Sequence, residues 1–303
     1  MTAKSTTANS TTEKLTIVLS LARGSDPARR TLQNELAAIL SASEPVDLRV
    51  IGHLYDLTPD GPVADTLRSI DGPMVVLASL YPRAAFWVLD AHEIKGRLGR
   101  TGFMPEETSD DSNDATGRSI WCIDLRPHND AQPVLAEIER IATELFGRPV
   151  TFDAAESTKD EVAAGTNEET KLRWYPVIDY SRCQNCMECL NFCLFGVYGV
   201  DASDRILVEQ PDACRAGCPA CSRVCPGEAI MFPEHQTPVI AGDPTAPSDG
   251  FNTGLVQLLG TPNPPDLAAA ERDRALAEKA NADKVAEKDE LDRLVDELDE
   301  IDL

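Results

Sequence analysis

The chain has 303 residues, of which 42% are hydrophobic and 26% charged, a balance typical of a soluble globular protein with one or two domains. Its 28 basic and 51 acidic residues give a formal net charge of −23, which disfavours binding to nucleic acid or an anionic membrane and favours basic partners. No apolar run approaches the roughly 20 residues that a transmembrane helix needs.

The first 14 residues are polar and of low complexity, a composition that predicts disorder. The apolar run 15–22 follows, and a short signal peptide has a similar core. However, almost no positive charge precedes this run, and it begins a repeating strand–helix pattern. We therefore interpret it as a strand and expect the protein to be cytoplasmic.

Residues 15–150 alternate apolar runs with amphipathic segments, a pattern that predicts a parallel sheet covered by helices, in a flavodoxin-like or chelatase-like α/β domain. A polar loop is expected at 103–117, before the last strand. The expected strands are 14–22, 46–54, 72–80 and 118–126, and the expected helices are 27–40, 62–70, 83–95 and 131–147.

A candidate binding site follows the first and third of these strands, because open parallel sheets bind ligands beyond the carboxyl ends of their strands. Arg23, Ser25, Tyr81 and Arg83 lie there, next to expected helix N-termini that favour an anion or phosphate. Ordinary helix capping and a surface for partner docking are the alternatives. Neither a dinucleotide-binding fingerprint nor a P-loop occurs in the chain. Whether this domain binds a flavin or another cofactor is left open.

Residues 21–40, LARGSDPARRTLQNELAAIL, resemble the first turn of the small chelatases that insert cobalt or iron into tetrapyrroles. That family carries His-Gly-Ser at this turn, and its histidine binds the metal. Arg23 occupies the corresponding position here, so the resemblance implies the fold without the chelatase chemistry.

The rest of the chain divides by composition. We expect an acidic linker at 151–171, a cysteine-rich domain at 172–241, a Pro-rich tether at 242–265 and an acidic helical tail at 266–303. The apolar repeat of the tail covers barely two heptads, which favours a solvated or docking helix over a dimer zipper. Its members are Leu291, Leu294, Leu298 and Ile301.

Eight of the nine cysteines lie in two short runs, CQNCMECLNFC at 183–193 and CRAGCPACSRVCP at 214–226. Disulfides are unfavourable in a reducing compartment, a redox dithiol needs one C-x2-C pair, and structural zinc usually takes two separated pairs. Each run instead has three closely spaced cysteines and a fourth after three residues, which favours 4Fe–4S clusters over zinc, the main alternative. The ninth, Cys122, lies in an expected strand and is interpreted as a small buried apolar residue.

The cysteine-rich segment resembles a bacterial-type ferredoxin domain with two 4Fe–4S clusters. The resemblance implies a pseudo-twofold βαββαβ fold in which each run lends its fourth cysteine to the other cluster. It assigns one cluster to Cys183, Cys186, Cys189 and Cys225. It assigns the second cluster to Cys214, Cys218, Cys221 and Cys193. This chain departs from the pattern at Leu194, where the family has proline, and in the C-x3-C spacing of the second run.

The resemblance implies an electron carrier that relays single electrons through two clusters between redox proteins, with no catalytic residue of its own. The partner is expected to carry a basic docking patch, given the acidity of this chain. An oxidoreductase whose amino-terminal domain binds a cofactor or substrate served by the clusters is the alternative, and a protein with purely structural clusters or zinc is another.

Overall fold

The computed structural model describes residues 14–105, 117–152, 171–246 and 266–278. The chain divides into two compact units, Met1–Arg173 with Ala241–Thr245 and Trp174–Ile240 with Ala246–Leu303. Disorder was expected at 1–14, and all of this segment except Lys14 lies outside the described residues. So do most of the linker and tether and the apolar repeat of the tail. In the part that is described, no helix is both long and apolar enough to span a membrane.

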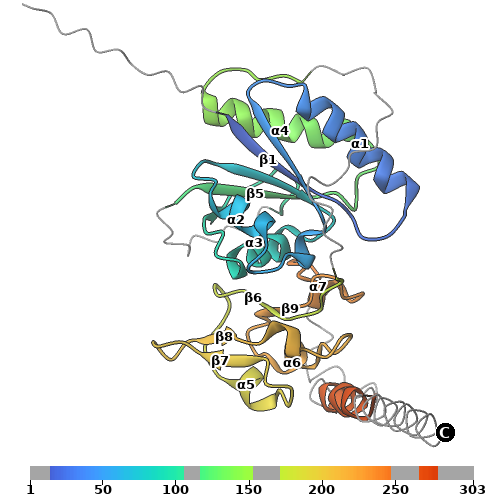
Figure 1. Ribbon diagram of the computed structural model, residues 1–303, viewed down its shortest axis with the longest axis vertical. Helices are drawn as coiled ribbons and strands as arrows, with labels where there is room; N and C mark the ends of the chain where they lie inside the picture. The colour runs from blue at the N-terminus through green and yellow to red at the C-terminus, as the bar shows by residue number, and fades with distance from the viewer. Residues whose placement is uncertain (1–13, 106–116, 153–170, 247–265, 279–303) are drawn as a thin grey trace, which may run out of the picture. The chain divides into compact units, whose positions relative to one another are not determined.

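The described part of the first unit is an α/β structure built on a parallel sheet with the strand order β2-β1-β3-β5-β4 (Figure 1). This confirms the expected α/β class with its parallel sheet. The strands are β1 (Leu15–Ser20), β2 (Val46–Ile51), β3 (Met74–Ala78), β4 (Arg97–Leu98) and β5 (Ser119–Asp124). The helices are α1 (Pro27–Ser41), η1 (Leu54–Asp56), α2 (Pro62–Arg68), α3 (Pro82–Ala91) and α4 (Ala131–Phe146).

Helices α1 and α4 cover one face of the sheet, and α2 and α3 lie on the other (Figure 1). Both α1 and α4 begin at an aspartate whose side chain accepts a backbone N–H, from Ala28 at 3.0 Å and from Gln132 at 2.9 Å. Their apolar stripes pack on alternate residues of the central strands. The core there includes Ile17, Leu19, Leu36, Leu40, Val75, Leu77, Ile123, Ile138 and Ile141.

Two local features differ from the pattern expected from the sequence. The edge strand β4 is additional; Gly96 and Gly99 flank it because a Cβ there would lie within 3 Å of the Ile120 and Trp121 side chains. Helix α3 ends at Ala91 rather than near 95, because Glu93 has a left-handed backbone (φ 62°) that stops the helix.

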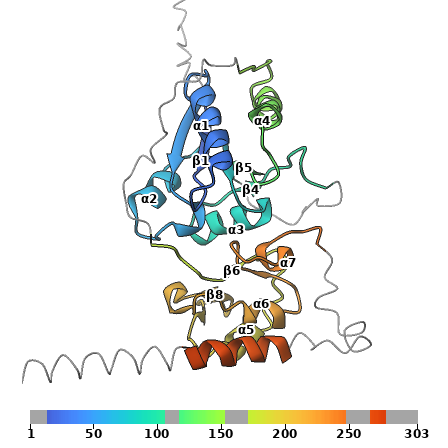
Figure 2. The same ribbon diagram turned by 90° about the vertical axis from the view of Figure 1, so that its right-hand side faces the viewer.

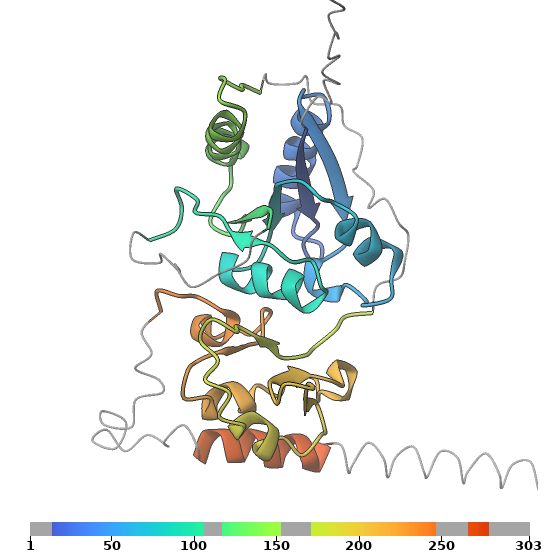
Figure 3. The same cartoon turned by 90° about the vertical axis from the view of Figure 1, so that its left-hand side faces the viewer.

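The second unit has the element order strand–helix–strand–strand–helix–strand, the βαββαβ order that the resemblance implies. Strand β6 pairs antiparallel with β9, and β7 pairs antiparallel with β8. A further helix at 266–278 lies alongside α5 and α6 (Figures 2 and 3). The elements are β6 (Val177–Ile178), α5 (Glu188–Phe192), β7 (Tyr198–Val200), β8 (Ile206–Val208), η2 (Pro211–Ala213), α6 (Ala220–Val224), β9 (Ile230–Met231) and α7 (Pro238–Ala241).

Candidate metal centre

Two cavities in the second unit are each lined by four cysteines. We call the first site I. It has about 360 Å³ of empty space, part of it open to solvent. Its thiols belong to Cys183, Cys186, Cys189 and Cys225, so three come from the first cysteine run and one from the second.

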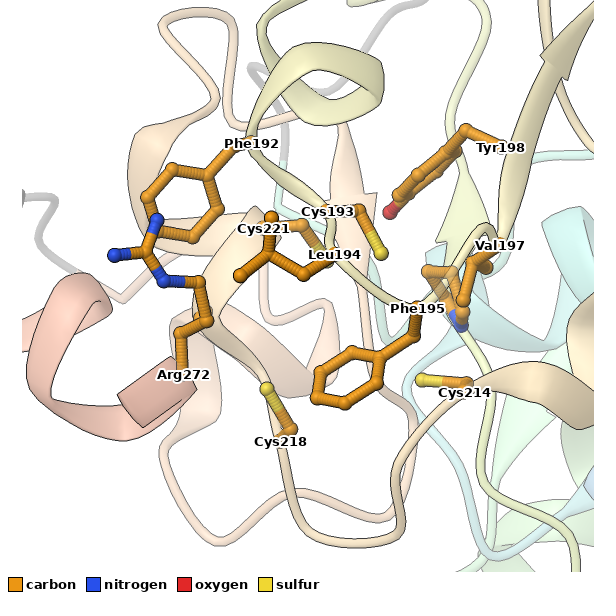
Figure 4. A pocket seen from close by; sticks show the side chains of 12 residues that line it. Phe192, Cys193, Leu194, Phe195, Val197, Tyr198, Cys214, Cys218, Cys221 and Arg272 are labelled. Carbon is orange, nitrogen blue, oxygen red and sulfur yellow. The ribbon is translucent and has the colours of Figure 1, made fainter. Parts of the chain in front are cut away.

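The other cavity, site II, has about 320 Å³ of empty space and is also partly open. Its thiols belong to Cys193, Cys214, Cys218 and Cys221, three from the second run and one from the first. Figure 4 shows these side chains surrounding the cavity together with Phe195, Tyr198 and Arg272. All eight clustered cysteines are therefore divided into two groups of four.

The two short helices produce this exchange of cysteines. Helix α5 contains Cys189 of site I, and Cys193 of site II directly follows its end. Helix α6 contains Cys221 of site II, and Cys225 of site I directly follows its end. Because five residues of helix advance about 7.5 Å, each helix carries the chain from one cavity to the next.

The loop before α5 is held in an unusual conformation. Asn185 and Met187 both have positive φ angles, 54° and 63°, so the backbone curls tightly between the cysteines. The Asn185 side chain fixes this loop on the β8 hairpin, since its Nδ2 donates to the Asp204 carbonyl at 2.7 Å and its Oδ1 accepts the Ile206 N–H at 2.8 Å.

Burial dominates the electrostatics of the thiols. It raises the pKa of Cys189 to about 12, and the thiols of Cys225 and Cys183 add to the increase. It also raises the pKa of Cys221 well above the ordinary value, with further contributions from Cys214 and Cys193. Such thiols keep their protons at neutral pH, so a metal that binds here must displace them.

The thiols surround a volume rather than a point. Among the described residues, no three His, Cys, Asp or Glu side chains come close enough to hold a single metal ion. Apolar side chains complete the walls: Val197 lines site II and Ile230 lines site I, and each is at least 95% buried. The backbone N–H of Ala229 donates to Cys225 Sγ at 3.3 Å in site I.

Sequence reasoning did not identify two residues that line site II, Tyr198 and Arg272. Tyr198 lies in β7 and is 5% exposed. Arg272 lies in helix 266–278, and its guanidinium is 4.8 Å from the centre of the Phe192 ring. The sequence offered a signal for Tyr198, because this residue is the fifth after Cys193. It offered no signal for Arg272, which lies more than 45 residues beyond the last cysteine.

The four candidate residues of the first unit have other neighbours. Arg23 forms a salt bridge with the buried carboxylate of Asp56, with 2.9 Å between Nε and Oδ2. The Tyr81 ring lies under the guanidinium of Arg126 at 3.8 Å. Ser25 is exposed and Arg83 is 8% exposed, in the first turn of α3. A role for these residues in binding an anion or a partner stays a prediction.

A curated protein, an uncharacterized ferredoxin of Methanocaldococcus jannaschii, is 43% identical to this chain over 68 residues. The chain contains a ferredoxin-like domain. The matched segment is 22% of this chain and 46% of the relative, so the chain spans about half the length of the ferredoxin that it matches. Comparison with the known protein families found no match. The ferredoxin likeness thus concerns one segment and leaves the rest of the chain unassigned.

Proposed function

We propose that residues 172–241 are a ferredoxin domain that holds two 4Fe–4S clusters and relays single electrons between redox proteins. Cys183, Cys186, Cys189 and Cys225 would hold one cluster in site I. Cys193, Cys214, Cys218 and Cys221 would hold the other in site II. We further propose that the partner proteins dock through basic surfaces, because this chain carries a formal charge of −23.

The observation that carries this proposal is the presence of two cavities, each lined by four thiols from both cysteine runs. This arrangement suits the bacterial two-cluster pattern, in which the fourth cysteine of one run serves the other cluster. The ferredoxin relative adds independent support for iron–sulfur chemistry.

The residues around the cysteines fit such a group in two respects. The backbone N–H of Ala229 already points at a cysteine sulfur, as expected where sulfur carries negative charge. The Tyr198 hydroxyl is buried in the wall of site II and has no nitrogen or oxygen partner among the described residues; it approaches the Cys221 thiol, so a sulfur atom is the acceptor open to it.

When bound, a 4Fe–4S cluster supplies a reversible one-electron couple. The protein contributes the surroundings that set the potential of this couple. Val197 and Ile230 line the two cavities, are at least 95% buried and exclude water from the sulfur atoms. The cysteine thiols lose their protons on binding, and the backbone curl at Asn185 holds the first loop in place.

Anaerobic purification followed by iron, acid-labile sulfide and zinc analysis tests the proposal. Two 4Fe–4S clusters require about eight iron and about eight sulfide per chain. The brown protein is expected to bleach reversibly with dithionite and to give an EPR spectrum of two interacting clusters. One or two zinc ions per chain with little iron would overturn the assignment.

A further inference from the structure

Tyr198 has the most unusual environment of the residues that line site II. Its side chain is 95% buried, and its hydroxyl has no nitrogen or oxygen partner among the described residues; the side chain that it approaches is the thiol of Cys221. Leaving a buried hydroxyl unpaired is unfavourable, so such a group normally indicates a missing partner. Figure 4 shows the hydroxyl oxygen directed toward Cys193 and Cys221, at the edge of the group of thiols.

The corresponding position in site I has no such group. Tyr198 is the fifth residue after Cys193 in CLFGVY, and Ile230 is the fifth residue after Cys225 in CPGEAI. Each is the first residue of a short strand and is at least 95% buried. Tyr198 lines site II, and Ile230 lines site I. The two halves of the domain therefore present a hydroxyl to site II and a purely apolar side chain to site I.

We propose that the Tyr198 hydroxyl donates a hydrogen bond to a sulfur atom of site II and so raises the reduction potential of that site alone. This inference rests on the proposed function. Reduction adds one electron, taken from a reduced partner protein, and increases the negative charge on the sulfur atoms. A donor facing them stabilises the reduced state more than the oxidised state. The proton stays on the tyrosine oxygen, so no proton is transferred and no covalent bond changes.

The phenol remains protonated over the working pH range. Burial raises the pKa of Tyr198 above its ordinary value, and the neighbouring side chain of Cys221 adds to this. The position of the hydroxyl in the cavity wall, not this shift, identifies it as a donor.

The test is a redox titration of Tyr198→Phe, followed by EPR and compared with the unmodified protein. Phenylalanine keeps the ring and its packing and removes only the donor. The equilibrium constant for reducing one of the two clusters is expected to fall about three- to tenfold, where tenfold corresponds to ~59 mV for a one-electron couple. The potential of the other cluster, and the iron and sulfide content, are expected to stay the same.

Tyr175→Phe is the matched control, because Tyr175 is 3% exposed in the same unit but lines neither cavity. It is expected to leave both potentials unchanged. Equal shifts of both clusters in Tyr198→Phe, or no shift in either, would contradict the proposal while leaving the two-cluster assignment intact. Unmodified protein that holds zinc and little iron would instead overturn the proposed function.

If Tyr198→Phe loses its iron, the same question can be asked without a mutation. Growth on 3-fluorotyrosine replaces all five tyrosines with a more acidic phenol, which is a stronger donor. Only Tyr198 among the tyrosines lines a cysteine cavity, so the potential of one cluster is expected to rise. Unchanged potentials in the fluorinated protein would refute the hydrogen bond.

Discussion

At the scale of single residues, the run to which a cysteine belongs does not by itself decide which cavity it lines. Cys193 belongs to the first run and yet lines the cavity of the second run, and Cys225 does the reverse. The electrostatic environment agrees, because Cys193 contributes to the raised pKa of Cys214, a thiol more than 20 residues away, after burial and Cys218. Because of this exchange, the iron lost by a double cysteine variant should depend on whether its two cysteines line the same cavity.

Replacing Cys193 or Cys214 with serine is expected to remove one cluster, about half of the iron, in each case. The double variant Cys193→Ser/Cys214→Ser should lose no more than either single variant, because both thiols line site II. Cys193→Ser/Cys189→Ser should lose nearly all of the iron, since its two substitutions affect both sites. Iron analysis and EPR measure these losses.

Cys122→Ala provides the control for these variants. Cys122 is fully buried in β5 of the other unit, and its substitution should leave iron content unchanged. The exchange would be wrong if Cys193→Ser/Cys189→Ser lost only half of the iron while Cys193→Ser/Cys214→Ser lost all of it. Each run would then hold its own cluster.

At the scale of elements, the apolar runs predicted the four long strands, which correspond to β1, β2, β3 and β5. The two-residue strand β4 could not be predicted, because it has no apolar run and exists through its pairing with β5. The cysteine spacing indicated the eight cysteines that line the two cavities. The contacts of Tyr198 and Arg272 could not be predicted, because they depend on tertiary packing. In particular, nothing in the sequence indicated where helix 266–278 lies.

Helix 266–278 packs on the second unit beside site II. Glu271 accepts two hydrogen bonds from Arg223 of α6, at 2.7 and 2.8 Å, and both side chains are only about 15% exposed. Ala268 and Ala275 are at most 5% exposed on the same helix, and Arg272 reaches the cavity wall. The helix therefore contributes one side chain, Arg272, to the wall of site II.

Glu271→Gln is expected to weaken the attachment of this helix by about 1–3 kcal/mol, because it removes a charge-assisted bidentate pair that is largely shielded from water. Hydrogen–deuterium exchange should become faster across 266–278. An iron chelator should then extract iron faster from one cluster than from the other.

Asp273→Asn on the same helix is the control, because its pair with Arg272 is exposed and contributes little. This variant should exchange and lose iron like the unmodified protein. Equal behaviour of both variants would show that the ion pair with Arg223 does not hold the helix in place.

At the scale of the whole molecule, charge governs which partners approach. The net charge of −23 attracts cations and repels anions over a Debye length of ~8 Å at physiological salt. The charges near the sites are more balanced: Arg223 is paired with Glu271, and Arg182 lies 3.8 Å from Asp179. Long-range attraction is thus a property of the chain as a whole, whereas the local surroundings set the potentials.

This division predicts opposite salt effects for two small electron acceptors. Oxidation of the reduced protein by a cationic cobalt hexaammine complex should slow down as salt is added, because screening removes the attraction. Oxidation by anionic ferricyanide should become faster, because screening removes the repulsion. Stopped-flow absorbance between low and high salt measures both rates on the same preparation. Rates that change in the same direction with both acceptors would mean that the charge near the exposed Cys186 in site I, rather than the total charge, controls the encounter.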